Sequence, residues 1–199
     1  MNGLDFCPIE KDEAQCMVVM NHYLHRRTNI THCFGIFRSK WCVGVVTFGV
    51  PPSRHLQVGM CPTAPNSVIE LNRLWVNDAE PRNTESWFVS KALRALPPRI
   101  VVSYADSAHQ HSGYIYRALN FYFAGMTDMD RKTPRYDYIV PGKHSREAFR
   151  GGDGVNAVKV RRLPKWRYWT VTGNRRECRD LERLARWPKL DWHDFEVNQ

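Results

Sequence analysis

One apolar stretch constrains the fold more than any other part of the sequence. Residues 101–107 begin with apolar side chains and then change abruptly to Asp106 and Ser107, as a buried strand does when it ends at a site. Residues 113–121 predict a helix that follows this strand. Because α/β proteins bind ligands at the carboxyl end of a strand beside a helix start, we expect a functional site here. Asp106 and Tyr116 are its candidate proton carriers.

Apolar periodicity and turn residues predict the remaining elements. Helices are expected at 8–23, 84–96 and 175–186, a hairpin at 33–37 and 41–50, further strands at 68–76, 136–140, 155–162 and 166–172, loops at 51–65 and 141–154, and a tail at 187–199. The helix after the first strand is expected to begin at Ser112 or Gly113, with Ile115, Leu119 and Tyr122 on one face. This order predicts an α/β fold with a mixed, mostly antiparallel sheet flanked by helices.

The length of 199 residues indicates one domain with a large core. We expect a catalytic domain at 1–173 and a basic C-terminal helix and tail at 174–199 that pack on it. The net charge is +9, which suits an acidic partner, with nucleic acid first and a membrane surface second. The charge is uneven, because residues 159–189 carry eleven basic and three acidic side chains.

The six cysteines are widely spread and form no Cys-x-x-Cys pair, which indicates reduced, mostly buried thiols. No signal peptide is visible, and no apolar run is long enough to span a bilayer. We therefore expect a cytoplasmic protein without a membrane partner. The sequence leaves the oligomeric state open, a homodimer included.

The order of elements resembles the GNAT family of N-acetyltransferases. The resemblance is sharpest at Tyr116-x-x-x-Asn120-Phe121-x-x-x-Gly125. This pattern is similar to the helix of that family that ends in Tyr-x-x-x-Gly-Phe, with Asn120 in place of the glycine. In many such enzymes the tyrosine is the acid that protonates the leaving CoA thiolate, and the resemblance implies this role for Tyr116.

Five pieces resemble, in the same order, the Mom proteins of bacteriophages, which are themselves GNAT-like. They are Asn21-His22-Tyr23, Glu70-Leu71-Asn72-Arg73-Leu74, Tyr104-Ala105-Asp106-Ser107, Gly113-x-x-Tyr116-x-Ala118-x-Asn120-Phe121 and Lys165-x-Arg167-Tyr168. Mom proteins convert the N6 amine of adenine in DNA into an N6-(carbamoylmethyl) derivative, which shields phage DNA from host restriction. The resemblance implies this transferase activity, a role for His22 and Tyr23 in catalysis, and a bound iron with His22 as a ligand.

The resemblance also implies acetyl-CoA or a related acyl-CoA as cofactor. GNAT enzymes usually hold the CoA pyrophosphate in an Arg/Gln-x-x-Gly-x-Gly/Ala loop, and the corresponding residues 81–86 contain no glycine. A helix N-terminus still offers N–H groups to a phosphate, whereas Glu85 has the wrong charge. Mom-like proteins generally lack a good glycine loop too. The expected cofactor-binding residues are Arg73, Arg82, Asn83, Thr84, Ser86, Ser107 and Asn120. If Arg73 is buried, its partner is a phosphate or a carboxylate such as Glu70.

The expected chemistry starts from a poor nucleophile, because the lone pair of adenine N6 is delocalised into the ring. Its modification needs a base or a strong electrophile, and an acid for the leaving group. Asp106 could accept the proton and Tyr116 could donate one; the alternatives are a helix cap for Asp106 and an aromatic packed on the sheet for Tyr116. His22 has acceptable chemistry for iron, but a helix-end histidine that binds phosphate or water is the alternative. His109 and His111 belong either to a metal site or to a solvated loop.

The C-terminal third carries the argument for double-stranded DNA as partner. Its expected DNA-binding residues are Lys165, Arg167, Arg175, Arg176 and Arg179, which interleave with Trp166, Tyr168 and Trp169. Basic side chains neutralise phosphates and aromatic ones stack on an exposed base, which the enzyme would expose by flipping it. The alternative is a basic amphipathic helix beside core tryptophans.

Three functions remain open on the sequence alone. The first is an adenine-modifying enzyme of the Mom type. The second is a GNAT-type acyltransferase that acts on another amine, of a small molecule, a protein or a different hypermodified base. The third is a non-catalytic nucleic-acid-binding module on a GNAT scaffold.

Overall fold

The computed structural model describes residues 3–128, 131–139 and 157–196. Its strands are β1 (Asp5–Pro8), β2 (His32–Arg38), β3 (Trp41–Gly49), β4 (Val68–Val76), β5 (Arg99–Asp106), β6 (Tyr122–Met126), β7 (Tyr136–Ile139), β8 (Val158–Arg161) and β9 (Lys165–Thr172). Its helices are α1 (Lys11–Asn21), α2 (Arg54–Met60), α3 (Thr84–Ala95), α4 (Tyr114–Ala118), α6 (Arg175–Leu184) and α7 (His193–Glu196), with short 3₁₀ turns η1 (Pro65–Ser67) and η2 (Ser107–His109).

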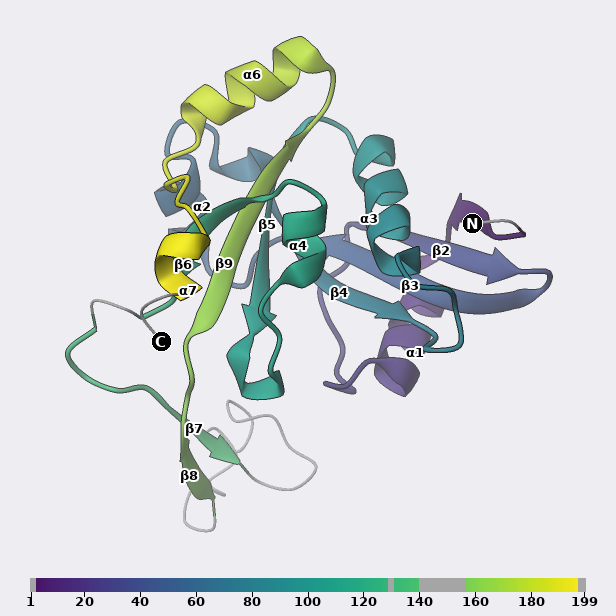
Figure 1. The fold of residues 1–199 in the computed structure, drawn as a ribbon, viewed down its shortest axis with the longest axis horizontal. Coiled ribbons are helices and arrows are strands. Elements are labelled where there is room, and N and C mark those ends of the chain that lie inside the picture. The colour runs from purple at the N-terminus through teal and green to yellow at the C-terminus, as the bar shows by residue number, and fades with distance from the viewer. Residues whose placement is uncertain (1–2, 129–130, 140–156, 197–199) are drawn as a thin grey trace.

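Seven strands form one sheet in the order β1-β2-β3-β4-β5-β9-β6, and β7 and β8 form a separate two-stranded ribbon (Figure 1). Neighbours in the large sheet are antiparallel except β4 and β5, which run parallel and are joined across α3, as a parallel pair requires. The predicted α/β class with a mixed, mostly antiparallel sheet is confirmed.

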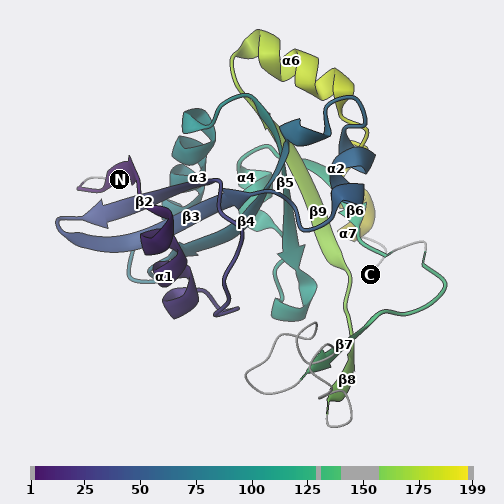
Figure 2. The same cartoon turned by 180° about the vertical axis from the view of Figure 1, so that it is seen from behind.

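The parallel pair separates part of the way along its length. β4 and β5 are in register only from Val68 opposite Ile100 to Glu70 opposite Val102. Beyond these residues the two strands diverge, with β5 running on to Asp106 (Figure 2). The gap is the reason that the carboxyl ends of both strands can present side chains to a ligand.

Strand alternation distributes the core over both faces of the sheet. On β5, Val101 packs with α3 and α4, whereas Ile100 and Val102 pack with α2 and α6. α1 covers a third cluster over the hairpin with Ala14 and Val18. The helices therefore lie on both sides of one sheet, as Figures 1 and 2 show from opposite directions.

The C-terminal segment packs against the edge of the large sheet. Leu190 forms a β-bridge with Phe123, and its N–H donates to the carbonyl oxygen of Phe123 at 2.8 Å. Trp192 is only 9% exposed and packs against Trp166, with ring centroids 4.6 Å apart. The short helix α7 follows it. The sequence does not single out Trp192 as buried, because an isolated tryptophan has no periodicity that reveals burial by long-range contacts.

Other predicted elements differ from the structure in detail. The predicted loop at 51–65 contains α2, and β1 was not predicted. The helix at 113–121 is limited to α4, and Tyr122 lies in β6 instead of on the helix face. The predicted loop at 141–154, like the beginning of the strand at 155–162, lies outside the described residues. No helix in the described ranges is both long and apolar enough to cross a membrane.

Gly113 allows close packing between α4 and β9. Its φ is +82°, and a Cβ added there would lie 2.3 Å from Cε2 of the buried Tyr168 ring. The hydroxyl of that ring donates to the carbonyl oxygen of Ser112 at 2.6 Å. We expect Gly113→Ala to destabilise the protein by about 3 kcal/mol, because steric overlap adds to a strained φ. Urea unfolding measures this effect.

Gly59→Ala is the matched control for Gly113→Ala. Gly59 lies in α2, and an added Cβ would meet no atom within 4 Å. The same change there should be neutral or stabilise by up to about 1 kcal/mol, because alanine favours a helix. Equal unfolding midpoints for both variants would contradict the packing argument at Gly113.

Candidate active site

A polar pocket occupies the gap between the diverging strands. Its volume is about 460 Å³, which is large enough for a small-molecule or nucleobase ligand. Its walls are residues 70–76 of β4, 104–106 of β5, 22–24 after α1, 110–116 around the start of α4, and Lys165 at the beginning of β9. The pocket lies where the sequence predicts a site, at the carboxyl end of β5.

Glu70 provides an ionisable group that the sequence analysis did not assign to catalysis. It lies on β4 at the last paired position before the strands diverge, and it lines the pocket. Burial raises the pKa of its carboxyl to about 7, although Arg73 and Lys165 draw it down. A carboxylate with such a pKa is suited to accept a proton near neutral pH. The available signal was a charged residue in the apolar run 68–71.

Arg73 brings an incompletely bonded cation into the pocket. Its Nη1 donates to the carbonyl oxygen of Asn72 at 2.6 Å, whereas its buried Nε has no hydrogen-bond partner in the described structure. Burial lowers the pKa of this guanidinium. A buried donor without a partner is costly unless a ligand satisfies it. The pocket therefore favours a ligand with an acceptor atom near Arg73.

Tyr116 is both packed on the sheet and part of the pocket wall. Its ring lies 5.3 Å from Phe121 and 5.2 Å from Tyr168, measured between centroids. Burial raises the pKa of its hydroxyl to about 12, and a hydrogen bond with Ser103 acts in the opposite direction. Tyr116 therefore keeps its proton at neutral pH and can donate it or a hydrogen bond.

Asp106 lines the pocket, but both of its carboxylate oxygens are engaged. Oδ2 accepts from Nζ of Lys165 at 2.5 Å, and Oδ1 accepts from the N–H of Ala108 at 3.1 Å. The second bond caps η2, which is the alternative that the sequence left open. This arrangement makes Asp106 a less available base than Glu70.

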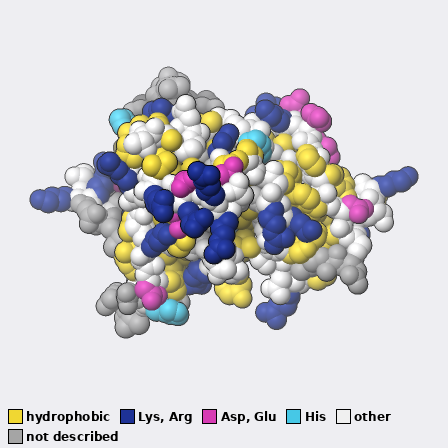
Figure 3. All heavy atoms as spheres, turned by 90° about the horizontal axis from the view of Figure 1, so that it is seen from above, with side chains coloured by type: hydrophobic (Ala, Val, Ile, Leu, Met, Phe, Trp, Pro, Cys, Tyr) yellow, Lys and Arg dark blue, Asp and Glu magenta, His cyan; other side chains and the backbone are white. Residues whose placement is uncertain are grey.

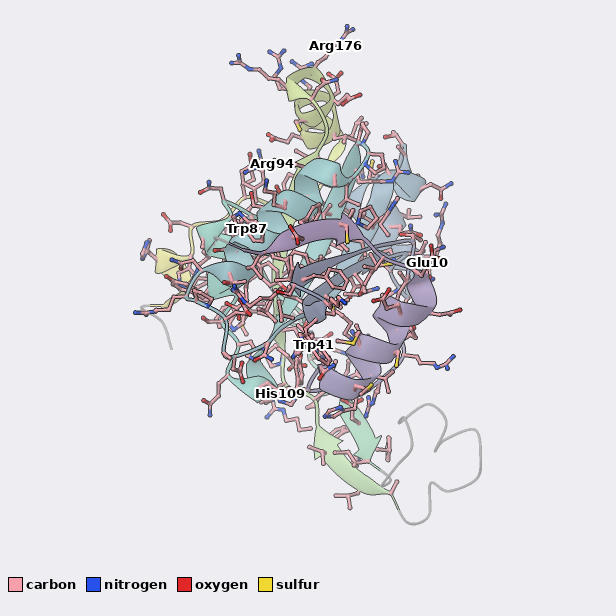
Figure 4. All side chains as sticks on the ribbon, turned by 90° about the vertical axis from the view of Figure 1, so that its right-hand side faces the viewer. Glu10, Trp41, Trp87, Arg94, His109 and Arg176 are labelled. Carbon is pink, nitrogen blue, oxygen red and sulfur yellow. The ribbon has the colours of Figure 1, made fainter. Side chains whose placement is uncertain are left out.

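Aromatic rings from two segments meet at the edge of the pocket. Tyr23 is 41% exposed; its ring centroid lies 4.3 Å from that of His22, 4.5 Å from that of His109 and 5.3 Å from that of His111. Figure 4 shows His109 near the end of α1, beside the sheet edge from which the β7–β8 ribbon extends. The two segments thus form one aromatic cluster, although 86 positions separate Tyr23 from His109 in the chain.

His22 does not fit the expected iron site. Its Nδ1 accepts the N–H of Leu24 at 3.1 Å, and burial lowers the pKa of the ring to about 4. A neutral ring whose Nδ1 accepts carries its proton on Nε2, so neither nitrogen is free to bind a metal. Among the described residues, no group of three or more His, Cys, Asp or Glu side chains could hold a metal ion.

The side-chain hydroxyls of the expected cofactor segment before α3 are already hydrogen-bonded. The hydroxyl of Thr84 donates to the carbonyl oxygen of Pro81 at 2.7 Å, and that of Ser86 to the carbonyl oxygen of Asn83 at 3.0 Å. Both hydroxyls are therefore used within the turn. From residues 81–86, Glu85 contributes to the pocket wall. Its carboxylate would repel a phosphate. The two hydroxyls are therefore not available to a CoA pyrophosphate, which would depend on the backbone N–H groups at the start of α3.

Three other expected cofactor residues also lie outside the pocket wall as described. Arg82 and Asn120 are exposed, and the hydroxyl of Ser107 donates to the carbonyl oxygen of Pro164. Asn120 has a φ of 57°, a conformation that asparagine and glycine tolerate best. This explains why an asparagine can replace the glycine of the GNAT pattern.

The expected DNA-binding residues separate into two groups. Lys165 lines the pocket, and Arg167 follows it two positions later on β9. The other three, Arg175, Arg176 and Arg179, lie on α6. α6 is at the opposite end of the sheet from His109, as the labelled Arg176 shows in Figure 4. In Figure 3 basic side chains over that end are interspersed with acidic ones.

The expected base-stacking role of the β9 aromatics is wrong. Trp166, Tyr168 and Trp169 are 7%, 0% and 1% exposed and belong to the two main core clusters. Strand β9 lies between β5 and β6, and the two clusters cover both of its faces. The alternative interpretation, in which these tryptophans belong to the core, is correct.

The mixed sheet and its flanking helices define an α/β protein. Solved structures with a similar fold are GNAT acetyltransferases. The structures include a GNAT acetyltransferase from Streptococcus pneumoniae, with a TM-score of 0.49, 11% identity, and coverage of 84% of this chain and 99% of that one. An N-acetyltransferase from Staphylococcus aureus has a TM-score of 0.48, 13% identity and coverage of 84% and 98%. A GNAT acetyltransferase from Elizabethkingia anophelis with acetyl-CoA bound has a TM-score of 0.44, 9% identity and coverage of 85% and 98%.

The sequence match is more specific than the structural one. The model of the Mom protein family matches residues 3–179, and the chain therefore belongs to the Mom protein family. A curated relative, the methylcarbamoylase mom of Escherichia phage Mu, is 34% identical over 120 residues, which cover 56% of this chain and 49% of the relative. The match thus spans about half the length of that relative. The predicted resemblance is confirmed.

Proposed function

We propose that this chain is a transferase that modifies the N6 amine of adenine in DNA and that the reaction occurs in the pocket between β4 and β5. The observation that carries the proposal is Glu70, a half-buried carboxyl with a pKa of about 7 in the pocket wall. Membership of the Mom family, with a relative named as a methylcarbamoylase, supports this acceptor and an N6-(carbamoylmethyl)adenine product.

The proposed chemistry uses groups of opposite function on the two sides of the pocket. Ionised Glu70 accepts the proton that N6 loses as its bond to the incoming group forms. Neutral Tyr116 donates a proton or a hydrogen bond to the group that leaves. The guanidinium of Arg73, which lines the pocket, supplies positive charge that attracts an acceptor atom of either substrate. No step is assigned to CoA or iron.

Access to N6 requires the adenine to leave the base pair. Tyr23, exposed at the edge of the pocket and stacked with His22, is placed to receive the flipped base. Aromatic stacking of a base is worth about 1–3 kcal/mol and depends little on sequence. In this proposal Tyr23 holds the base while Glu70 approaches its amine.

The proposed product suggests the setting of the reaction. A bulky group on adenine N6 projects into the major groove, where restriction enzymes read the base edges. We propose double-stranded DNA in the bacterial cytoplasm as the partner and protection of phage DNA from restriction as the result.

Mass spectrometry of nucleosides from cells that express the whole chain tests this proposal. We expect deoxyadenosine with the added mass of one carbamoylmethyl group. A new mass on another nucleoside would replace adenine as the acceptor. Unmodified DNA together with retained DNA binding would instead support a binding module without catalysis, and the proposal would be rejected.

A further inference from the structure

We propose that the β7–β8 ribbon binds duplex DNA and holds it beside the pocket. We call this element the arm and define it as residues 131–139 and 157–164, which the structure describes. The inference rests on the proposed function, since it assigns the surface that holds the same DNA substrate. In Figures 1 and 4, which differ by a quarter turn, the arm extends away from the body of the molecule.

The arm concentrates positive charge. It contains six basic residues and a single acidic one. Arg131 and Arg135 lie 3.6 Å from Asp128, and Arg162 pairs with Asp137. Within the described residues, three basic side chains of the arm have no carboxylate partner: Lys132, Lys159 and Arg161. Helix α6, in contrast, carries four basic and three acidic residues.

The pairing register places aromatic and basic side chains on one face of the ribbon. Tyr136 is opposite Arg161, and Tyr138 is opposite Lys159, and residues opposite each other share a face. Nζ of Lys159 lies 4.2 Å from the ring centroid of Tyr136. The strand positions between them place Val158 and Val160 on the other face. The first face combines phosphate-binding cations with hydroxyl-bearing rings.

The arm joins the body of the molecule next to Lys165, which lines the pocket. The N–H of Lys165 donates to Oγ1 of Thr127 at 2.8 Å, and the N–H of Thr127 donates to the carbonyl oxygen of Lys165 at 2.8 Å. Nζ of Lys165 reaches Asp106 inside the pocket. A duplex held on the arm would therefore run past the opening of the pocket, where Tyr23 is exposed.

The dimensions of the arm suit a DNA groove. A two-stranded β-ribbon fits the major groove, which is about 12 Å wide. The seven residue steps from Val158 to Lys165 span up to about 23 Å when extended, at roughly 3.3 Å per step. A ribbon of that reach can follow the groove while its base stays at the pocket. Helix α6 is separated from the same point by the whole length of β9.

Two variants with the same change in charge test the arm. The first is Lys132→Gln, Lys159→Gln and Arg161→Gln on the arm; the second is Arg175→Gln, Arg176→Gln and Arg179→Gln on α6. All six side chains are exposed, and circular dichroism checks that both variants fold. The main measurement is the affinity of the full chain for a short DNA duplex over a range of salt concentrations. Sedimentation gives the mass of each variant in solution, and DNA modification is measured in cells.

We expect the arm variant to lose on the order of tenfold or more in affinity at low salt and about three in the slope of log K against log salt, since each phosphate contact contributes about 0.9. Its DNA modification should fall in parallel, and the α6 variant should stay close to the wild type.

The role of the arm would be overturned if both variants lost the same affinity, or if the arm variant kept the wild-type salt slope. It would also be overturned if the arm variant sedimented with a smaller mass than the wild type while its DNA affinity stayed unchanged. A wild-type protein that neither binds nor modifies DNA would overturn the proposed function itself.

Discussion

Replacement of Glu70 by glutamine is expected to lower the rate of DNA modification by at least about 10²-fold, the usual contribution of a general base. Glutamine has nearly the same shape and hydrogen-bonding reach but cannot accept the proton. DNA affinity should not change, because Glu70 lies in the pocket wall and not on the arm. Single-turnover modification of a DNA duplex measures the rate.

The pH dependence provides a second signature of Glu70. A base acts when ionised, so the wild-type rate should rise with pH up to about 7 and then level off, following the pKa of this carboxyl. The matched control is Glu85→Gln, which removes an exposed carboxylate from the same pocket and should keep this profile. A Glu70→Gln enzyme with an unchanged rate and profile would return the role of base to Asp106.

Trp192→Ala is expected to destabilise the protein by about 3–5 kcal/mol, as is usual when a buried tryptophan is truncated. The indole packs with its ring centroid 4.6 Å from that of Trp166 and 5.0 Å from that of Phe123, and the guanidinium of Arg117 lies 4.1 Å from its centre. The change would therefore leave a cavity between β6, β9 and the C-terminal segment. Urea unfolding followed by circular dichroism measures the loss.

Trp41 offers the same substitution in a different environment. It begins β3 and is 78% exposed, so Trp41→Ala should change stability by no more than about 0.5 kcal/mol. If both variants unfolded at the same urea concentration, the C-terminal segment would not be part of the core.

Strong local signals made much of the fold predictable. β4, β5 and α3 were placed almost to the residue, because their apolar periodicity and their Pro, Asn and Thr boundaries agree. α4 was predicted too long, because the positive φ of Asn120 ends the helix and asparagine alone does not require this conformation. The burial of Trp192 depends on contacts with Phe123 and Trp166, which no local pattern contains.

The sequence predicts where the pocket lies but not that Glu70 lines it. Asp106 and Tyr116 do meet at the pocket, because a strand end and a following helix start are adjacent in any α/β fold. The pKa of Glu70 results from burial between strands that diverge, which only the assembled sheet reveals. The basic run at 159–189 looked continuous, but β9 carries its two halves to opposite ends of the sheet.

The half-buried carboxyl of Glu70 sets chemical reactivity against conformational stability. Its folded-state pKa of about 7 exceeds the ordinary 4.5, so the folded chain binds this proton more tightly than the unfolded chain does. The stabilisation is complete below pH 4.5 and is lost as the pH rises to about 7. The ionised form that base catalysis uses is thus the form that the fold tolerates least. The positive charges of Arg73 and Lys165 lower the pKa of Glu70. They thereby reduce the free-energy cost of ionising this carboxyl in the folded protein.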